Sequence, residues 1–527
     1  MKKPLPAAAA AKTVALSPGL KRYLYLTAAI TGASIMIVEI LGAKMLAPYV
    51  GTSHFVWTAQ IAVTLVALAT GYYTGGRLVD RSPKLRRLYL GIMGAAIYLG
   101  FSVLAVRPVA YWCLDFKLAI GSLLASAFLF FIPLALLAMV GPFFVRILTV
   151  SVAGVGGNVG RLTALSTLGS FFGTVLIGYV LIPFFPNSWT MLLTAFILAA
   201  VAAVYFAAWD RRGGVKRALA GVLFVGLLAY VGIRVDGRKA AGDLVERFRG
   251  NSNFGLVQVM DNEEGDRRYY LNDFLTQNIY DPQARQSVTL FTYMLHDLAR
   301  AYTPRVETAL CIGMGMGIVP TQLAREGVAV DVVEINPAVV SVAEKYFDCE
   351  PGRFRVEIGD GRQFINRATN RYDTILLDAF LGDSSPSHLM TREAFDSMRH
   401  LLKPGGTLVI NAFVDLRPGN DFFGASLEKT LQTVFKNVRL HASATDDLAN
   451  VFYVASDQAD FSMTAPAGFD HVSTVCRERA VRTFQNVVHA IPENGLVLTD
   501  DYNPVDFRDA ANRETTRRRM AERMRSL

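Results

Sequence analysis

The stretch that decides the fold of the C-terminal half runs from Glu307 to Gly317 and reads ETALCIGMGMG. Its apolar part, Glu307–Ile312, predicts a buried strand. Glycines at 313, 315 and 317 predict a turn in which the backbone approaches a ligand closely before a helix begins. The turn contains no lysine to hold phosphate, which argues against a nucleoside triphosphate as the ligand.

Strands and single helices alternate on both sides of this stretch. The order predicts a parallel, doubly wound α/β sheet, Rossmann-like and of the class I methyltransferase type, after a small β-hairpin. The predicted strands are Glu307–Ile312, Ala329–Glu334, Phe354–Ile358, Tyr372–Asp378 and Thr407–Asn411, and the hairpin strands are Gly255–Val259 and Arg268–Leu271.

Acidic residues lie at the ends of three of these strands. Glu334 follows Gly313 by 21 residues, the place for a carboxylate that accepts from both ribose hydroxyls, and Asp360 and Asp378 end the next two strands. Each alone is also explained as a solvated strand end or, for Asp360-Gly361, as a helix cap. Together they predict one nucleoside cavity, and carboxylates favour a ligand with a positive charge, such as a sulfonium.

The N-terminal half is far more apolar. The chain is 52% hydrophobic and 18% charged, and no Asp, Glu, Lys or Arg occurs from Leu162 to Trp209. Stretches of bilayer-spanning length predict a multi-pass α-helical membrane domain over residues 1–235. They lie near 23–43, 55–76, 88–106, 119–145, 162–183 and 189–208, and a seventh, 218–233, is shorter.

Basic residues predict the orientation of these spans. Sixteen Lys and Arg residues flank the spans on the side of the N-terminus and three on the other, so the N-terminus is expected in the cytoplasm of a cell with an inner membrane. If 218–233 also spans, the C-terminal domain lies outside. We favour an interfacial or re-entrant 218–233 and a cytoplasmic domain, because nucleosides of this kind are made inside the cell.

The charge and the cysteines exclude other classes. The net charge of +9 is concentrated beside the spans and in a basic tail, 511–527, which indicates membrane-flanking charge and no nucleic-acid partner. Four cysteines without ligand spacing predict neither a metal site nor a disulfide framework. Gly169 and Gly173 form a GxxxG pattern, which predicts close helix packing.

Further motifs point to a family. They are LAPYVGT (46–52), GRLTALSTLG (160–169), DAFLGDSSP (378–386) and TDDYNPV (499–505). With them the chain resembles the spermidine synthase (polyamine aminopropyltransferase) family, in its branch with N-terminal spans. The resemblance covers about 245–510 and implies a catalytic domain over 236–510. It also implies aminopropyl transfer from decarboxylated S-adenosylmethionine to an amine such as putrescine, with release of methylthioadenosine.

The resemblance also implies residue roles. Asp378 matches the acid that takes a proton from the attacking amine, and Asp383 and Tyr293 are the candidates for binding that amine. Asp273 and Gln277 match the Asp and Gln of the family's DGxxQ turn. The residues implied to bind the donor are Gln277, Gly313, Gly315, Gly317, Glu334, Asp360 and Gly361; no metal is implied.

Three departures leave two other functions open. Met316 stands where the family's glycine turn has an acid, Phe291-Thr292-Tyr293 replaces Tyr-His-Glu, and Gly255 replaces a Gln. An ammonium group without these partners loses binding energy in a dry pocket. The alternatives are methyl or alkyl transfer from S-adenosylmethionine to a membrane-proximal acceptor, and a non-catalytic nucleoside sensor. The expected partners are a small amine and the lipid bilayer, and a homo-oligomer is compatible with the sequence.

Overall fold

A computed structural model describes residues 16–51, 54–149, 154–210, 214–237, 244–380, 385–464, 466, 468–490 and 492–526. The chain divides into two compact units. The first contains Met1–Leu46, Trp57–Val109 and Ser122–Arg238, and the second contains Ala47–Val56, Ala110–Gly121 and Lys239–Leu527.

The first unit is helical. Within the described residues, seven helical segments are long and apolar enough to cross a membrane, and they include all six predicted spans. The predicted stretch 218–233 lies within a seventh apolar segment of 21 residues, Gly214–Arg234. The segments are α1 (Pro18–Val50), α2 (His54–Arg81), α3 (Leu85–Cys113), the run Leu118–Leu148 (α4 to α6), the run Val155–Phe184 (α7, η3 and α8), α9 (Asn187–Trp209) and α10 (Gly214–Gly237).

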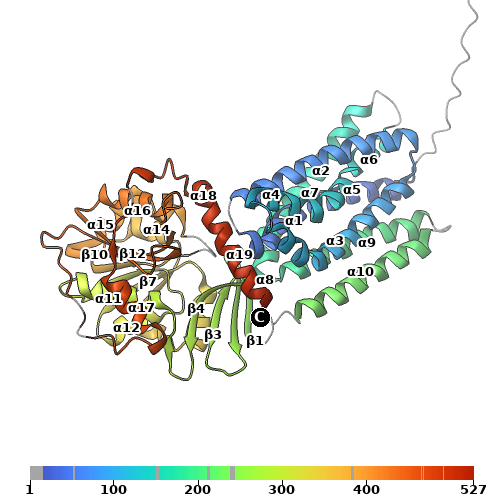
Figure 1. Cartoon of the computed structure of the whole chain (residues 1–527). Coiled ribbons are helices and arrows are strands. Elements are labelled where there is room, and N and C mark those ends of the chain that lie inside the picture. Colours follow the sequence, from blue (N-terminus) through green and yellow to red (C-terminus); the bar gives the residue numbers. More distant parts are fainter. Residues whose placement is uncertain are drawn as a thin grey trace, which may run out of the picture. The chain divides into compact units, whose positions relative to one another are not determined.

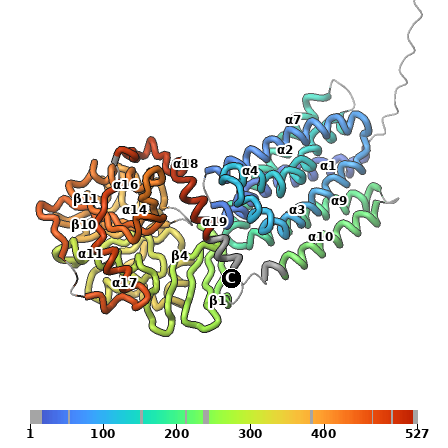
Figure 2. The backbone as a smooth tube through the Cα atoms, viewed as in Figure 1, coloured from blue at the N-terminus to red at the C-terminus, as the bar shows by residue number. Residues whose placement is uncertain are grey.

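These helices approach one another closely at glycine residues. A Cβ atom at Gly169 would lie 2.0 Å from the carbonyl oxygen of Ala29 in α1, so the close packing expected from the GxxxG pattern is confirmed. Helix α10 runs along α9 (Figures 1 and 2). A Cβ atom at Gly221 of α10 would lie 2.6 Å from the sulfur of Met93 in α3. Helix α10 is therefore packed as a member of the helical bundle.

The second unit is built on an eight-stranded sheet in the order β13-β11-β12-β10-β9-β6-β7-β8. Its five parallel strands are the five that the sequence predicts, and three antiparallel strands that were not predicted extend one side. The strands are β6 (Thr308–Ile312), β7 (Ala329–Glu334), β8 (Arg355–Ile358), β9 (Tyr372–Leu377), β10 (Leu402–Asp415), β11 (Asn437–Ala442), β12 (Leu448–Ser456) and β13 (Val487–Val488).

Helices cover both faces of this sheet (Figure 1). Successive residues of a strand point to opposite faces, so Leu310 and Ile312 pack with one set of helices and Ala309 and Cys311 with the other. The first set is α14 (Gly361–Arg367), α15 (Arg392–Leu401) and α16 (Phe422–Gln432); the second is α11 (Leu290–Tyr302), α12 (Ile318–Arg325) and α17 (Thr474–Gln485). The predicted doubly wound class is confirmed.

The predicted hairpin is part of a larger sheet. Its two strands, β2 (Gly255–Asn262) and β3 (Arg268–Asn272), lie in a five-stranded antiparallel sheet with β1 (Leu244–Ser252), β4 (Leu275–Asp281) and β5 (Gln286–Ser287). Side chains of β2 and β3 pack with Met316 and with helix α13 (Pro337–Tyr346). This sheet is therefore joined to the glycine turn through a shared apolar cluster.

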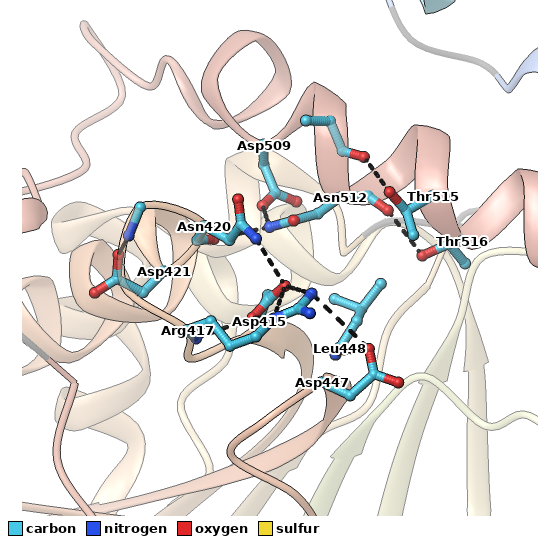
Figure 3. Close-up of polar contacts among 12 residues, drawn as sticks. Asp415, Arg417, Asn420, Asp421, Asp447, Leu448, Asp509, Asn512, Thr515 and Thr516 are labelled. Atoms are coloured by element: carbon cyan, nitrogen blue, oxygen red, sulfur yellow. Dashed lines mark hydrogen bonds and ion pairs between the residues drawn. The ribbon is translucent and has the colours of Figure 1, made fainter.

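The residues predicted as a basic tail form helix α19 (Ala510–Ser526), which follows the short helix α18 (Val505–Arg508). Figure 3 shows how α19 begins. The amide of Asn512 donates to the carbonyl of Asn420 and to Asp509, both at 2.8 Å. Asn420 in turn donates to Asp415 at the end of β10. These bonds fix the start of α19 to the C-terminal end of the central strand β10.

Candidate functional site

The order of the parallel strands reverses at β6, which lies between β7 and β9, and ligands of such sheets bind at this point. Backbone hydrogen bonds of 2.9 Å join Gly313 to Val333 and Asp378 to Ile312. The glycine turn and Asp378 therefore lie side by side at the C-terminal edge of the sheet. A cavity of about 590 Å³ opens there, within the size range of small-molecule sites.

The glycine turn leaves no room for a side chain at its first position. Gly313 has φ +90°, and a Cβ atom there would lie 2.3 Å from the carbonyl oxygen of Asp378. A Cβ atom at Gly315 would meet nothing within 4 Å, although φ is +51°. Both glycines line the cavity, whereas Gly317 is outside the lining and precedes the first residue of α12. The backbone of 313–315 thus forms part of the cavity wall.

Glu334 lies at the end of β7 and is only 7% exposed. Its two carboxylate oxygens accept hydrogen bonds from the backbone amides of Met314 (3.0 Å) and Asn336 (2.8 Å). Burial raises the pKa of Glu334, and these backbone hydrogen bonds act in the opposite direction. The carboxylate lines the cavity in a fixed orientation, and each oxygen keeps a lone pair for a ligand hydroxyl.

Asp360 combines the two roles considered for it. One oxygen caps α14 by accepting from the backbone amide of Gln363 at 2.9 Å, and the other lies 3.1 Å from Nε2 of His388. Asp360, Gly361 and His388 all line the cavity. The helix cap therefore presents its carboxylate to the ligand space as well.

Asp378 follows β9 and is partly exposed to the cavity. Asn411 at β10 donates to its Oδ1 at 2.8 Å, and Asn450 at β12 donates to the side-chain oxygen of Asn411 at 2.9 Å. Burial raises the pKa of Asp378 to about 6, against the effect of the Asn411 hydrogen bond. Both asparagines also line the cavity. Sequence reasoning missed them, because nothing in the strand patterns distinguishes a polar residue that contacts an acid.

The remaining candidates differ in where their side chains lie. The donor-binding candidate Gln277 lines the cavity, but the amine-binding candidate Tyr293 does not: its hydroxyl donates to the carbonyl of Ser287 at 2.7 Å, and its ring faces His471. Its neighbours Phe291 and Thr292 line the cavity instead, because successive residues of α11 point in different directions. Asp383 lies outside the described residues.

Met316 is only 1% exposed and packs among apolar side chains, although it contributes to the lining. Within the described lining, the carboxylates are those of Glu334, Asp360 and Asp378. Aromatic side chains supply much of the remaining wall: Phe254, Tyr269, Tyr270, Phe274, Phe291, Phe380 and Phe413. The cavity therefore has three acids at strand ends and a largely apolar remainder.

The region that contains the cavity matches known proteins. Residues 289–460 match the family model of the spermine/spermidine synthase domain. Over 140 residues the chain is 43% identical to the polyamine aminopropyltransferase of Vibrio vulnificus, covering 25% of this chain and 46% of that protein. Over 260 residues it is 28% identical to the N-terminal histidine N-methyltransferase of Emericella nidulans, covering 44% and 46%. The chain spans about half the length of these curated relatives.

Among solved structures, the spermidine synthase of Thermotoga maritima superposes with a TM-score of 0.35 and 19% identity, over 41% of this chain and 74% of that one. The sequence match over residues 289–460 coincides with the strands and loops that carry Gly313, Glu334, Asp360 and Asp378. The C-terminal part of this chain therefore carries a spermine/spermidine synthase domain, and the relatives of that domain indicate a transferase.

Proposed function

We propose that this domain transfers an aminopropyl group from decarboxylated S-adenosylmethionine to a small amine. The observation that carries the proposal is the placement of Asp378 beside the glycine turn, in one cavity with Glu334 and Asp360. The matched domain and the name of the Vibrio relative, a polyamine aminopropyltransferase, support it.

In this reaction the amine nitrogen attacks the methylene carbon beside the sulfonium. A C–N bond forms, the C–S bond breaks, and its electron pair neutralises the sulfur of the methylthioadenosine that leaves. The attacking amine must first lose a proton, since an alkylammonium has a pKa of roughly 10. Asp378 takes that proton, and its partner Asn411 holds Oδ1 so that Oδ2 is directed to the substrate.

The other two acids bind the nucleoside. Glu334 accepts hydrogen bonds from the ribose hydroxyls while its backbone bonds keep it in place, and Asp360 accepts from the adenine amino group. The glycine backbone at 313 and 315 lets the donor approach the sheet closely. Much of the acceleration then comes from holding donor and acceptor in line.

Methyl transfer from intact S-adenosylmethionine is a second candidate, and Met316 favours it. A buried thioether at this position offers no charge for the donor's ammonium group, and apolar side chains surround it. The name of the Emericella relative, an N-terminal histidine N-methyltransferase, points the same way. In both reactions Asp378 would accept the proton of an attacking nitrogen.

One assay separates these reactions. Purified full-length protein is incubated with each labelled donor and a panel of amines and peptides, and the thioether product is identified. Methylthioadenosine supports aminopropyl transfer. S-adenosylhomocysteine contradicts it and supports methyl transfer, and nucleoside binding without turnover contradicts both and supports a sensor.

We further propose that the first unit anchors this domain in the cell membrane, with the domain in the cytoplasm. The seven apolar helical segments support the anchoring. The cytoplasmic side follows from the proposed donor, which is made inside the cell.

A further inference from the structure

A group of potential metal ligands lies outside the cavity lining. His296 and Asp297 are on α11, and His471 precedes α17. The ligand atoms of these three side chains all lie within 4.8 Å of one another. Oδ1 of Asp297 is 2.9 Å from Nδ1 of His296 and 2.9 Å from Nε2 of His471. Two imidazole nitrogens and a carboxylate oxygen are thus close enough to bind one ion.

A second carboxylate holds the other side of His296. Nε2 of His296 lies 2.8 Å from Oε1 of Glu326, the residue that ends α12. Gln322 donates to the same oxygen at 2.7 Å, and Arg300 pairs with the other oxygen. A histidine that binds a metal usually donates its second N–H to a carboxylate, which fixes its tautomer and ring orientation. Glu326 already occupies that position.

The charges and the exposure of the group suit a cation. Against the effect of burial, hydrogen bonds to Asp297 and Glu326 raise the pKa of His296 to about 9, so a metal ion must replace its second proton. The imidazoles are then neutral, and Asp297, Glu326 and Arg300 together carry one net negative charge. The side chain of Asp297 is 3% exposed and that of His296 13%, so this charge lies in a poorly solvated place, whereas His471 is 42% exposed. Solvent therefore reaches the group at His471, where a metal ion can enter and retain a water ligand.

We propose that His296, Asp297 and His471 form a binding site for a divalent transition-metal ion, Zn²⁺ by the chemistry of its ligands, with Glu326 orienting His296. Zinc binds imidazole nitrogen and carboxylate oxygen, whereas Mg²⁺ and Ca²⁺ prefer oxygen ligands alone. Ligand atoms around a tetrahedral zinc ion are roughly 3.3 Å apart, from bonds of about 2.0 Å. The observed 2.9 Å spacings widen by only a few tenths of an ångström on binding.

The metal site would stabilise two helices that form part of the cavity wall. Helix α11 lines the cavity with Phe291, Thr292 and Leu295, and α17 contributes Arg479. A metal ion bound to Asp297 and His471 would join α11 to the segment that leads into α17. It would fix two walls of the cavity and take no part in the transfer.

The sequence predicted no metal, because its ligands are not close along the chain. His471 lies 174 residues after Asp297, and no spacing motif connects them. The packing of α17 against α11 brings them together.

Direct measurement of metal binding tests the proposal without reference to turnover. Full-length protein in detergent is stripped with a chelator, dialysed and titrated with ZnCl₂ against a chromophoric chelator, and its metal content is measured. We expect one tightly bound zinc per chain and a higher unfolding temperature with zinc. Co²⁺ in the same site should show the intense visible absorption of a tetrahedral complex. Absence of stoichiometric zinc binding by the wild type would overturn the proposal.

Matched variants locate the ion. His471→Ala should weaken zinc binding at least 100-fold, and Glu326→Gln about 10- to 100-fold. His400→Ala, at a histidine of α15 with a 70% exposed side chain, should bind zinc like the wild type. Unfolding temperatures of the stripped proteins show whether each variant is folded. Tight binding that survives His471→Ala, or that is lost in His400→Ala, would place the zinc elsewhere and contradict the site.

Discussion

The side-chain amide of Asn411 donates a hydrogen bond of 2.8 Å to Oδ1 of Asp378, and Asn450 holds the carbonyl oxygen of the same amide. This second bond fixes which end of the Asn411 amide faces the acid. Asp378 thus always meets a donor, which favours its ionised form against the effect of burial.

Replacing this donor should weaken the proposed base. We expect Asn411→Leu to lower kcat/KM roughly 10- to 100-fold, the value of one hydrogen bond to a charged group. The apparent pKa of the acidic limb of the pH profile should rise, because an influence that lowers the pKa of Asp378 is gone. Asn450→Leu should act in the same direction with a smaller effect. An unchanged pH profile in Asn411→Leu would exclude this role.

The wild-type pH dependence should reflect Asp378 itself. Since burial raises its pKa to about 6, the carboxylate that accepts a proton forms only above that pH. We expect kcat/KM in the proposed transfer to rise through pH 6 and to level off above pH 7, apart from the ionisation of the acceptor amine. Comparing acceptors of different basicity separates the two ionisations. If the apparent pKa of the acidic limb changes only with the pKa of the acceptor amine, Asp378 is not the group that titrates.

Asp378→Asn should separate catalysis from stability. Turnover should fall by at least about 100-fold, because a general base is removed. Folding raises the pKa of Asp378 from about 3.9 to about 6. Its contribution to stability is therefore complete below pH 4 and is lost as the pH rises through 6. The variant has no charge to bury, so its unfolding temperature should exceed that of the wild type at pH 7.5 and match it near pH 4.

The glycine turn offers a matched pair of substitutions. Gly313→Ala would bring Cβ to 2.3 Å from the carbonyl oxygen of Asp378, so the two adjacent strand ends must separate. We expect a large fall in unfolding temperature and loss of nucleoside binding. Gly315→Ala has open space and bears only the cost of a left-handed backbone, about 1 kcal/mol. Thermal unfolding and donor binding measure both, and equal effects would contradict this account.

The side of the membrane on which the domain lies depends on α10. This helix packs along α9 and contacts α3 like other members of the bundle. With a cytoplasmic N-terminus and six other spans, a cytoplasmic domain requires that α10 does not cross the membrane. We expect a green fluorescent protein fused after Gly237 to fluoresce, because the proposed donor is made in the cytoplasm. A phosphatase fused at the same point should be inactive. An active phosphatase there would place the domain outside and contradict its proposed access to the donor.

Local sequence patterns were sufficient to predict most of the fold. The five parallel strands are apolar runs bounded by turns. Because parallel strands end at the same edge of the sheet, the residues at their ends, such as Glu334 and Asp378, could be predicted to lie near one another. The strands β11 to β13 were missed because a parallel α/β pattern gives no signal for antiparallel additions. Tyr293 does not line the cavity, because the sequence gives its position along α11 and not the direction of its side chain.

Helix α19 also has a consequence for when the cavity is completed. Thr516 lines the cavity, about 200 residues after the glycine turn that forms another part of its wall. Ribosomes make the apolar helices first, then the turn and the acids, and the helix that supplies Thr516 long afterwards. Throughout this interval the nascent domain holds an unfinished binding site, so it should acquire its full affinity for nucleoside only after α19 has been translated.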